Sequence, residues 1–188
     1  AKRFSASHPS FVLEFNIGRL CLDRGRVVDA LNHLSTFATE DQSFSSCYWI
    51  AEAYRVNGKH QGAEVMLKRA LDERRPLEKS PRSASAWNRL GVVQLKLGNA
   101  VEALASFDQA LQNQKDFAAA RRNLAITLHQ HAPLDMPDRD AHTLRAFKEY
   151  LALEPADAAA LQQVADELEA KIRLASARTF SAPTHSPP

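Results

Sequence analysis

Three stretches of the chain can be aligned with one another on single glycines, Gly25, Gly58 and Gly98. In each stretch a large apolar residue stands eight positions before the glycine. A very small residue directly follows that apolar residue. An alanine stands five positions after the glycine, and a large apolar residue four positions further on. The matching sets are Ile17, Gly18, Ala30 and Leu34; Ile50, Ala51, Ala63 and Leu67; and Leu90, Gly91, Ala103 and Phe107. An internal repeat of this kind predicts a repetitive architecture.

The pattern of small and large residues predicts the structure of one unit. A small residue on a helix lets a neighbouring helix approach closely, and a large residue on that neighbour fills the space beside it. The glycine between the two segments is typical of a tight connection between antiparallel helices. Each unit is therefore expected to be a helical hairpin.

The third copy closely resembles the tetratricopeptide repeat, a family with units of about 34 residues. It matches seven of the eight residues of the family's usual pattern, including its common glycine extension. The matching residues are Trp87, Leu90, Gly91, Gly98, Ala103, Phe107 and Ala110. Gln94 departs from the pattern, because the family has an aromatic residue there, and the second copy supplies that aromatic as Tyr54.

The resemblance implies an all-α, right-handed α-solenoid of about four helix-turn-helix repeats with a C-terminal capping helix. The fourth copy carries Leu124, Ala125 and Leu128 in the same register, but a longer proline-containing loop, residues 131–140, replaces its glycine. The tetratricopeptide domain is expected over residues 11–175, with repeats at about 11–43, 44–76, 84–117 and 118–155. A shorter insertion, residues 76–81, separates the second and third copies.

The two ends of the chain differ in pattern from the repeats. Residues 157–175 place five apolar side chains on one helical stripe, which predicts a capping helix that covers the last repeat. The stripe consists of Leu161, Val164, Ala165, Leu168 and Ile172. Residues 1–10 are expected to be a linker or tail, and residues 176–188, rich in Ser, Thr and Pro, a disordered tail.

The composition agrees with a single elongated domain. The chain has 188 residues, of which 45% are hydrophobic and 24% charged, with a net charge of +2. No apolar run approaches the roughly 20 residues needed to cross a bilayer, so no membrane insertion is expected. The compartment stays open, cytoplasmic or periplasmic, and abundant Ala and Arg are a weak indication of a bacterial source. Cys21 and Cys47 stand at core positions and are expected to be buried free thiols.

The resemblance also indicates where a partner would bind. In this family the first helices of successive repeats line a concave groove that usually holds an extended or helical segment of another protein. The register projects the following residues onto that groove: Asn16, Arg19, Tyr48, Trp49, Glu52, Arg55, Asn88, Arg89, Lys96, Arg122, Asn123, His129 and Gln130. Basic residues outnumber acidic ones in this set, and Tyr48 with Trp49 can supply an apolar anchor. An acidic and hydrophobic partner segment is therefore expected.

A subgroup of the family binds the C-terminal carboxylate of its partners through a fixed set of Lys, Asn and Arg residues. This chain lacks that set, because Tyr48 and Glu52 occupy the places of its opening pair and Ala119 that of a later lysine. Capture of partner C-termini by that mechanism is therefore disfavoured.

Several other functions fit the sequence less well. No nucleophile with a base, paired carboxylates or cofactor motif appears at a recognisable spacing, so neither catalysis nor a cofactor is expected. His129 and His131 point to different faces of a helix, which disfavours zinc. The loop acids Asp135, Asp138 and Asp140 lack the glycine and glutamate of the twelve-residue calcium site.

Two non-catalytic alternatives remain. A basic groove could follow phosphates, but the chain has no basic run and no aromatic stacking series, so nucleic acid is not the expected partner. The module could instead self-associate or act as a spacer within a longer protein, since both ends resemble linking segments and an uncapped end repeat can stack on another chain.

Overall fold

The computed structural model describes residues 9–35, 43–72, 80–133 and 136–180, which form helices and no strands. The predicted all-α class is therefore confirmed. The chain divides into two compact units, Ala1–Lys115 and Asp116–Pro188, and each is described by itself. Residues 1–8 of the predicted linker, residues 76–79 of the predicted insertion, Asp135 and the tail from residue 181 lie outside the described residues.

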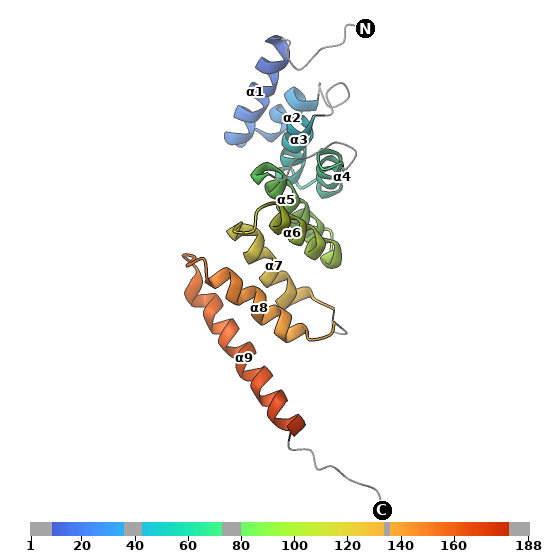
Figure 1. Cartoon of the computed structure of the whole chain (residues 1–188). Helices are drawn as coiled ribbons and strands as arrows, with labels where there is room; N and C mark the ends of the chain where they lie inside the picture. Colours follow the sequence, from blue (N-terminus) through green and yellow to red (C-terminus); the bar gives the residue numbers. More distant parts are fainter. Residues whose placement is uncertain (1–8, 36–42, 73–79, 134–135, 181–188) are drawn as a thin grey trace, which may run out of the picture. The chain divides into compact units, whose positions relative to one another are not determined.

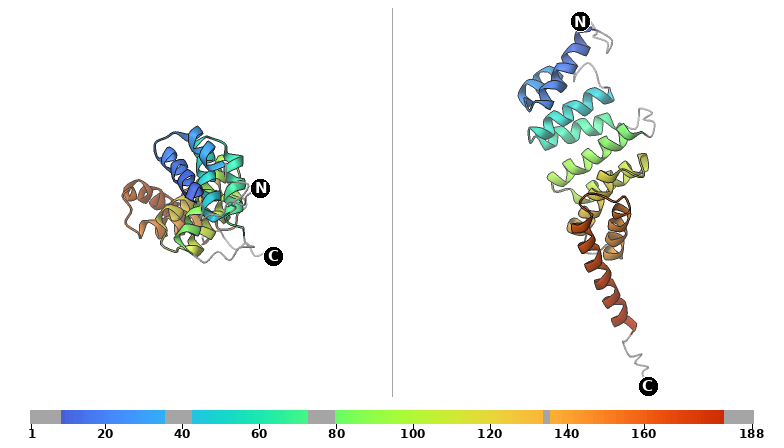
Figure 2. Two further views of the ribbon diagram at one scale, coloured as in Figure 1. Left: turned by 90° about the horizontal axis from the view of Figure 1, so that it is seen from above. Right: turned by 90° about the vertical axis from the view of Figure 1, so that its left-hand side faces the viewer.

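Six helices in the first unit form three hairpins (Figure 1). They are α1 (Pro9–Asp23), α2 (Val27–Ser35), α3 (Phe44–Val56), α4 (His60–Ala70), α5 (Pro81–Lys96) and α6 (Ala100–Asn113). The two helices of each hairpin pack against each other, α2 packs against α3, and α4 packs against α5. Figure 2 shows the second and third hairpins stacked side by side. This is the arrangement of a helical repeat array.

The three aligned glycines form the turns within these hairpins. Gly25, Gly58 and Gly98 have φ angles of +72°, +74° and +84°, in the left-handed region that favours glycine. At the last turn the N–H of Asn99 donates to the carbonyl oxygen of Gln94 over 2.9 Å, which closes a Schellman motif after α5. The glycine register therefore marks where each first helix ends.

The small residue of each first helix contacts the large residue of the second. A Cβ atom on Gly18 would lie 2.6 Å from Cγ of Leu34, so this pair is packed too closely for any larger residue at position 18. In the second hairpin Ala51 and Leu67 are each 1% exposed and belong to the same core cluster. The packing predicted from the repeat is thus present in the structure.

The start of α5 lies earlier than the sequence analysis expected. The third repeat was predicted to begin near residue 84, whereas α5 begins at Pro81. Ser80 is the N-cap, and its Oγ accepts a hydrogen bond from the backbone N–H of Ser83 over 3.2 Å. Proline suits the first helical position because its missing N–H has no partner there in any case. The capping serine was overlooked as a start signal.

Three helices form the described part of the second unit: α7 (Ala118–His131), α8 (Arg139–Leu151) and α9 (Ala158–Phe180). α8 packs against both α7 and α9. Ala165 and Leu168 of the predicted apolar stripe are buried, which agrees with α9 as a cap on the last pair. However, α9 continues to Phe180, so the first five residues of the predicted tail are helical, and its last turns extend beyond α8 (Figure 2).

Two further expectations concern the cysteines and the membrane. Cys21 and Cys47 are 7% and 1% exposed, and neither forms a disulfide. Both are therefore buried thiols outside any disulfide, as predicted. Within the described ranges, no helix combines the length and apolar character that a bilayer crossing requires.

Candidate functional site

The first helices of the three hairpins in the first unit surround a pocket of about 400 Å³. α1, α3 and the start of α5 all contribute side chains. The lining residues are Phe15, Arg19, Phe44, Ser45, Tyr48, Trp49, Pro81, Arg82 and Ser85. We call this the aromatic pocket.

Four aromatic side chains give the aromatic pocket its apolar wall. The rings of Phe44 and Tyr48 are stacked with their centroids 5.9 Å apart, because the two residues are one turn apart on α3. The ring of Trp49 meets that of Tyr48 edge-on at 5.6 Å. From α1, the Arg19 guanidinium lies over the Trp49 ring, 4.5 Å from its centroid. This cation–π contact holds a positive charge at the apolar wall.

The hydroxyl group of Tyr48 is fixed by α5. Nε of Arg89 donates a hydrogen bond to the Tyr48 hydroxyl oxygen over 2.8 Å, and Oγ of Ser85 lies 3.2 Å from the same oxygen. The Tyr48 ring is thus held by its neighbours on α3 and by two residues of α5. A pocket wall fixed in this way loses little conformational entropy when it is covered.

Glu52 connects α3 to α5 through an ion-pair cluster. Its carboxylate lies 3.0 Å from Nη1 of Arg89 and accepts a hydrogen bond from Nε of Arg55 over 3.2 Å. The Glu52 side chain is only 11% exposed. Hydrogen bonding to Glu52 raises the pKa of the Arg55 guanidinium above its ordinary value. Two of the predicted groove arginines therefore share one carboxylate, which reduces the excess positive charge expected there.

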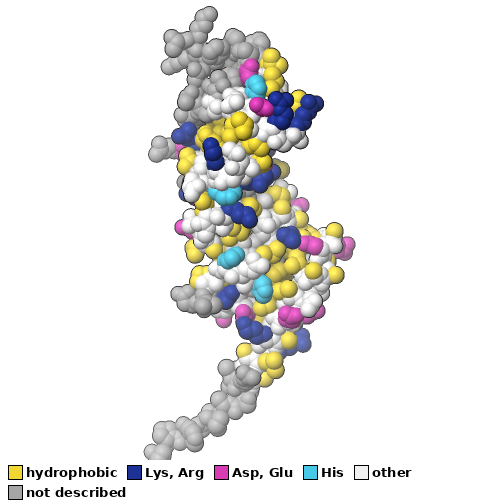
Figure 3. Space-filling model, turned by 180° about the vertical axis from the view of Figure 1, so that it is seen from behind, with side chains coloured by type: hydrophobic (Ala, Val, Ile, Leu, Met, Phe, Trp, Pro, Cys, Tyr) yellow, Lys and Arg dark blue, Asp and Glu magenta, His cyan; other side chains and the backbone are white. Residues whose placement is uncertain are grey.

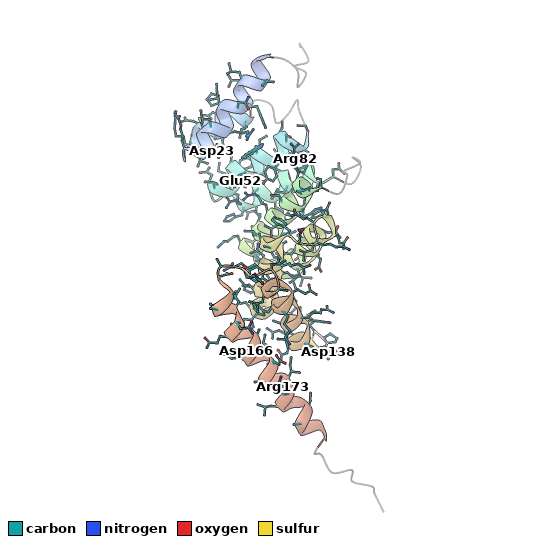
Figure 4. The ribbon with its side chains drawn as sticks, turned by 60° about the vertical axis from the view of Figure 1, so that its left-hand side comes forward. Asp23, Glu52, Arg82, Asp138, Asp166 and Arg173 are labelled. Carbon is teal, nitrogen blue, oxygen red and sulfur yellow. The ribbon has the colours of Figure 1, made fainter. Side chains whose placement is uncertain are left out.

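The positive charge that remains at the aromatic pocket comes from Arg19 and Arg82. Both residues are exposed, and neither forms an ion pair with any residue that the structure describes. Figure 4 labels Arg82 at the start of α5 and Glu52 on α3. The part of the pocket lining that the structure describes contains no acidic residue. The pocket therefore combines an aromatic wall with two available guanidinium groups.

The predicted groove residues of the first unit fall into three groups. Arg19, Tyr48 and Trp49 line the aromatic pocket, and Glu52, Arg55 and Arg89 form the ion-pair cluster beside it. The other three line neither: Asn16 and Lys96 are exposed, and Asn88 is half-buried.

Six pocket residues were not predicted, and the repeat register could have found most of them. Phe15 stands ten residues before its glycine, the position of Tyr48 in the second copy. Phe44 and Ser45 lie one helical turn before Tyr48 and Trp49, on the same face of α3. Ser85 is the counterpart of Ser45 in the third copy. Pro81 and Arg82 were missed because α5 was expected to begin later.

Arg122 is the predicted groove residue of the second unit that forms an ion pair with a described residue. Its Nε donates to Oδ2 of Asp157 over 2.7 Å, and the Tyr150 hydroxyl donates to Oδ1 of the same carboxylate over 2.7 Å. Hydrogen bonds from Arg122 and then Tyr150 lower the pKa of Asp157, and the bond to Asp157 raises the pKa of Arg122. Burial is the main cause of the raised pKa of Tyr150. Arg122 thus joins α7 to the segment before α9.

The remaining predicted residues of the second unit lie along α7. His129 packs edge-on against Phe147 with ring centroids 5.9 Å apart, and its carbonyl oxygen accepts a hydrogen bond from Nη2 of Arg139. Gln130 is exposed. The carbonyl oxygen of Asn123 accepts a hydrogen bond from Oγ1 of Thr127. Two pockets of the second unit are lined by α8, its flanking residues and α9, and none of these residues is in their lining.

Charged side chains of both signs are mixed on the molecular surface. On the face drawn in Figure 3, Lys and Arg side chains stand among acidic and hydrophobic ones. Within the described ranges, no three His, Cys, Asp or Glu side chains are grouped so that they could hold a metal ion. The aromatic pocket is one place where apolar surface and positive charge meet.

Comparisons with known proteins identify the repeat. Residues 44–116 match the model of the tetratricopeptide repeat family. Curated protein sequences give no significant match.

Solved structures with a similar fold include MamA 41-end from Desulfovibrio magneticus RS-1, at 20% identity and a TM-score of 0.67, covering 93% of this chain and 99% of that one. YrrB is described as a tetratricopeptide repeat protein with an unusual peptide-binding site. It is 19% identical with a TM-score of 0.65, and the match covers 83% of this chain and 76% of YrrB. TTC0263, a protein of Thermus thermophilus, is 25% identical with a TM-score of 0.57, and the match covers 82% of this chain and 79% of TTC0263. Residues 44–116 thus carry the tetratricopeptide repeat by sequence, and the described helices have the fold of tetratricopeptide repeat proteins.

Proposed function

We propose that the chain is a non-catalytic interaction scaffold that binds a segment of a partner protein across α1, α3 and α5. Tetratricopeptide repeats are generally non-catalytic interaction modules, so the family supports this class of function. The observation that carries the proposal is the aromatic pocket, in which the Arg19 guanidinium lies over Trp49 beside a hydrogen-bonded Tyr48. Aromatic and arginine side chains are the residue types that dominate binding energy at protein interfaces.

The chemistry of the aromatic pocket favours a segment with one apolar side chain next to a carboxylate. Phe15, Phe44, Tyr48 and Trp49 offer apolar surface to the side chain. Arg19 and Arg82 offer planar guanidinium groups that can donate two hydrogen bonds to one carboxylate. Among the described residues, the lining holds no carboxylate that would compete for them. A peptide ligand is also consistent with YrrB, which shares the fold and is described as having a peptide-binding site.

Selection from a library of random peptides displayed on phage tests this proposal without knowledge of the partner. The parent chain is the bait, beside Arg19→Glu and Arg82→Glu. Arg69→Glu is the matched control, because Arg69 is an exposed arginine of α4 that lines neither the aromatic pocket nor the hollow between α4, α5 and α6. Each variant must first keep the helicity and melting temperature of the parent.

We expect the parent and Arg69→Glu to enrich the same peptides, which combine Asp or Glu with Phe, Tyr, Trp or Leu. Loss of a charge-assisted hydrogen bond of about 1.5–3 kcal/mol should remove most of these peptides from Arg19→Glu and Arg82→Glu. Equal enrichment on all four baits, or no enrichment on the parent, would count against the aromatic pocket as the binding site.

Self-association is a second candidate, and a feature of α1 favours it. Val12, Leu13 and Leu20 are 46%, 60% and 49% exposed and lie within one face of that helix. The outer face of an end repeat is the surface that a further repeat would otherwise cover. Light scattering across a concentration series separates the candidates, since a monomer at every concentration excludes self-association and leaves peptide binding untouched.

A further inference from the structure

A second hollow, of about 630 Å³, lies between α4, α5 and α6. It shares no lining residue with the aromatic pocket. Its walls include Leu71 directly after α4, Trp87, Leu90 and Gln94 from α5, and Glu102 and Ser106 from α6. We call it the Gln94 hollow.

The repeat register explains why the Gln94 hollow exists. Gln94 stands four residues before Gly98, the position that Tyr54 occupies before Gly58. In the second hairpin the Tyr54 ring lies against α4, with Cδ2 only 3.2 Å from where a Cβ atom of Gly62 would be. The counterpart of Gly62 in the third hairpin is Glu102, which lines the hollow together with Gln94. The third repeat thus has Gln94 and Glu102, which both line the hollow, where the second repeat has the Tyr54 ring packed on Gly62.

The side chain of Gln94 has unused hydrogen-bonding capacity at this place. Gln94 is only 3% exposed, and its Oε1 accepts a hydrogen bond from Oγ of Ser106 over 2.7 Å. The amide nitrogen has no partner among the residues that the structure describes. If the amide is turned over, the oxygen is left without a partner instead, so one polar atom remains available in either orientation. The available atom is not fully enclosed by protein, so a polar group in the hollow can pair with it.

The charges around the Gln94 hollow argue against an anionic ligand. Among the described residues that line it, Asp72 and Glu102 contribute two carboxylates and Lys68 the one cation. Nζ of Lys68 already lies 2.7 Å from Oε1 of Glu64. A neutral group with an apolar ring and one hydrogen-bonding atom fits these walls better than a carboxylate or a phosphate.

We propose that the Gln94 hollow binds a tyrosine side chain presented by a partner protein. The ring occupies the place that the Tyr54 ring fills in the second hairpin, beside the indole of Trp87. The phenolic hydroxyl pairs with the free atom of the Gln94 amide, since a hydroxyl group can either donate or accept. Binding of the tyrosine in the Gln94 hollow does not depend on binding at the aromatic pocket.

The probe that tests this is N-acetyltyrosinamide, titrated into the ¹⁵N-labelled chain and followed by NMR. We expect shifts of the Gln94 side-chain amide and of the Trp87 indole N–H, and no shift of the Trp49 indole N–H. N-acetylphenylalaninamide, which lacks the hydroxyl, should bind about fivefold more weakly. N-acetylleucinamide should leave both signals unchanged.

Two variants at residue 94 distinguish the contribution of the tyrosine ring to binding from that of the Gln94 amide. Gln94→Tyr should fill the hollow from within, raise the melting temperature and abolish binding of N-acetyltyrosinamide. Gln94→Leu keeps the space open but removes the amide, so it should bind the tyrosine and phenylalanine probes equally. Arg19→Glu, which disables the aromatic pocket, should leave the titration unchanged. Unmoved Gln94 and Trp87 signals in the parent, equal binding of the leucine probe, or binding that survives in Gln94→Tyr would overturn the proposal.

Discussion

Gly91 and Phe107 lie so close together that a Cβ atom at residue 91 would stand 2.5 Å from Cε1 of the Phe107 ring. Phe107 is fully buried, so the ring has no space into which it could retreat. At the same positions the second hairpin has Ala51, which is larger than Gly91, and Leu67, which is smaller than Phe107. Each hairpin thus keeps a small residue on its first helix matched to a large residue on its second.

We expect Gly91→Ala to lower the free energy of unfolding by about 1–3 kcal/mol, because overpacking against Phe107 outweighs the gain in helix propensity. Adding Phe107→Leu recreates the pair of the second hairpin. The double variant should therefore lose less stability than the two single variants together, as measured by urea denaturation. Simple additivity would show that the two residues are not coupled.

The sequence alone predicted this pairing because the repeat places the two residues in the same register three times. The register of Gly25, Gly58 and Gly98 likewise predicted the turns and the hairpins that they join. Burial follows from the same pattern, since one face of each helix must be covered by its neighbour. The fold was therefore predictable from local periodicity, apart from the early start of α5 and the late end of α9.

The contacts of the candidate site were less predictable. The ion pair of Glu52 with Arg89 and that of Arg122 with Asp157 join residues 37 and 35 positions apart, and no spacing rule connects them. The register could assign a residue to a face but could not show which charges on that face neutralise each other. The same limit applies to Gln94, whose departure from the pattern was visible although the hollow beside it was not.

The turn glycines allow a test of backbone conformation without packing. No atom lies within 4 Å of a Cβ atom built on Gly98, whose φ angle is +84°. Gly98→Ala should therefore cost about 1–2 kcal/mol of stability through the left-handed conformation alone. Gly98→Asn should cost less, because Asn adopts this conformation more readily. Equal losses for Ala and Asn in thermal unfolding would show that backbone conformation does not set the cost.

Glu52 should matter more to stability than a typical surface acid, because its carboxylate serves two arginines at 11% exposure. We expect Glu52→Gln to lower the free energy of unfolding by about 1–2 kcal/mol. Asp29→Asn is the matched control, since Asp29 pairs with Arg26 on an exposed surface, and it should have a much smaller effect. Similar losses of stability for both variants in urea denaturation would contradict a stabilising role of the ion-pair cluster.

Asp157 gives the chain a pH-dependent contribution to stability. The hydrogen bonds from Arg122 and Tyr150 lower its pKa in the folded state below the ordinary value of 3.8. The folded state therefore binds this proton less readily than the unfolded state. The contribution is present above pH 3.8 and is lost as the pH falls through the lower folded-state pKa.

Asp157→Asn removes this contribution. The parent should exceed the variant in stability at pH 7, and the gap should narrow as the pH falls below 3.8. Titration of the Asp157 side-chain carbon signal by NMR reports the folded-state pKa directly. A value at or above 3.8, or a gap that widens at low pH, would contradict the role of Arg122 and Tyr150.

If the aromatic pocket of α1, α3 and α5 binds the partner segment through Arg19 and Arg82, the affinity for that segment must depend on both arginines. A peptide recovered by selection on the parent chain can be labelled with a fluorophore, and fluorescence anisotropy then measures its affinity. This dependence predicts that Arg19→Glu and Arg82→Glu each weaken the affinity about tenfold or more, whereas Arg69→Glu leaves it unchanged. Equal affinity for the parent and all three variants would contradict it.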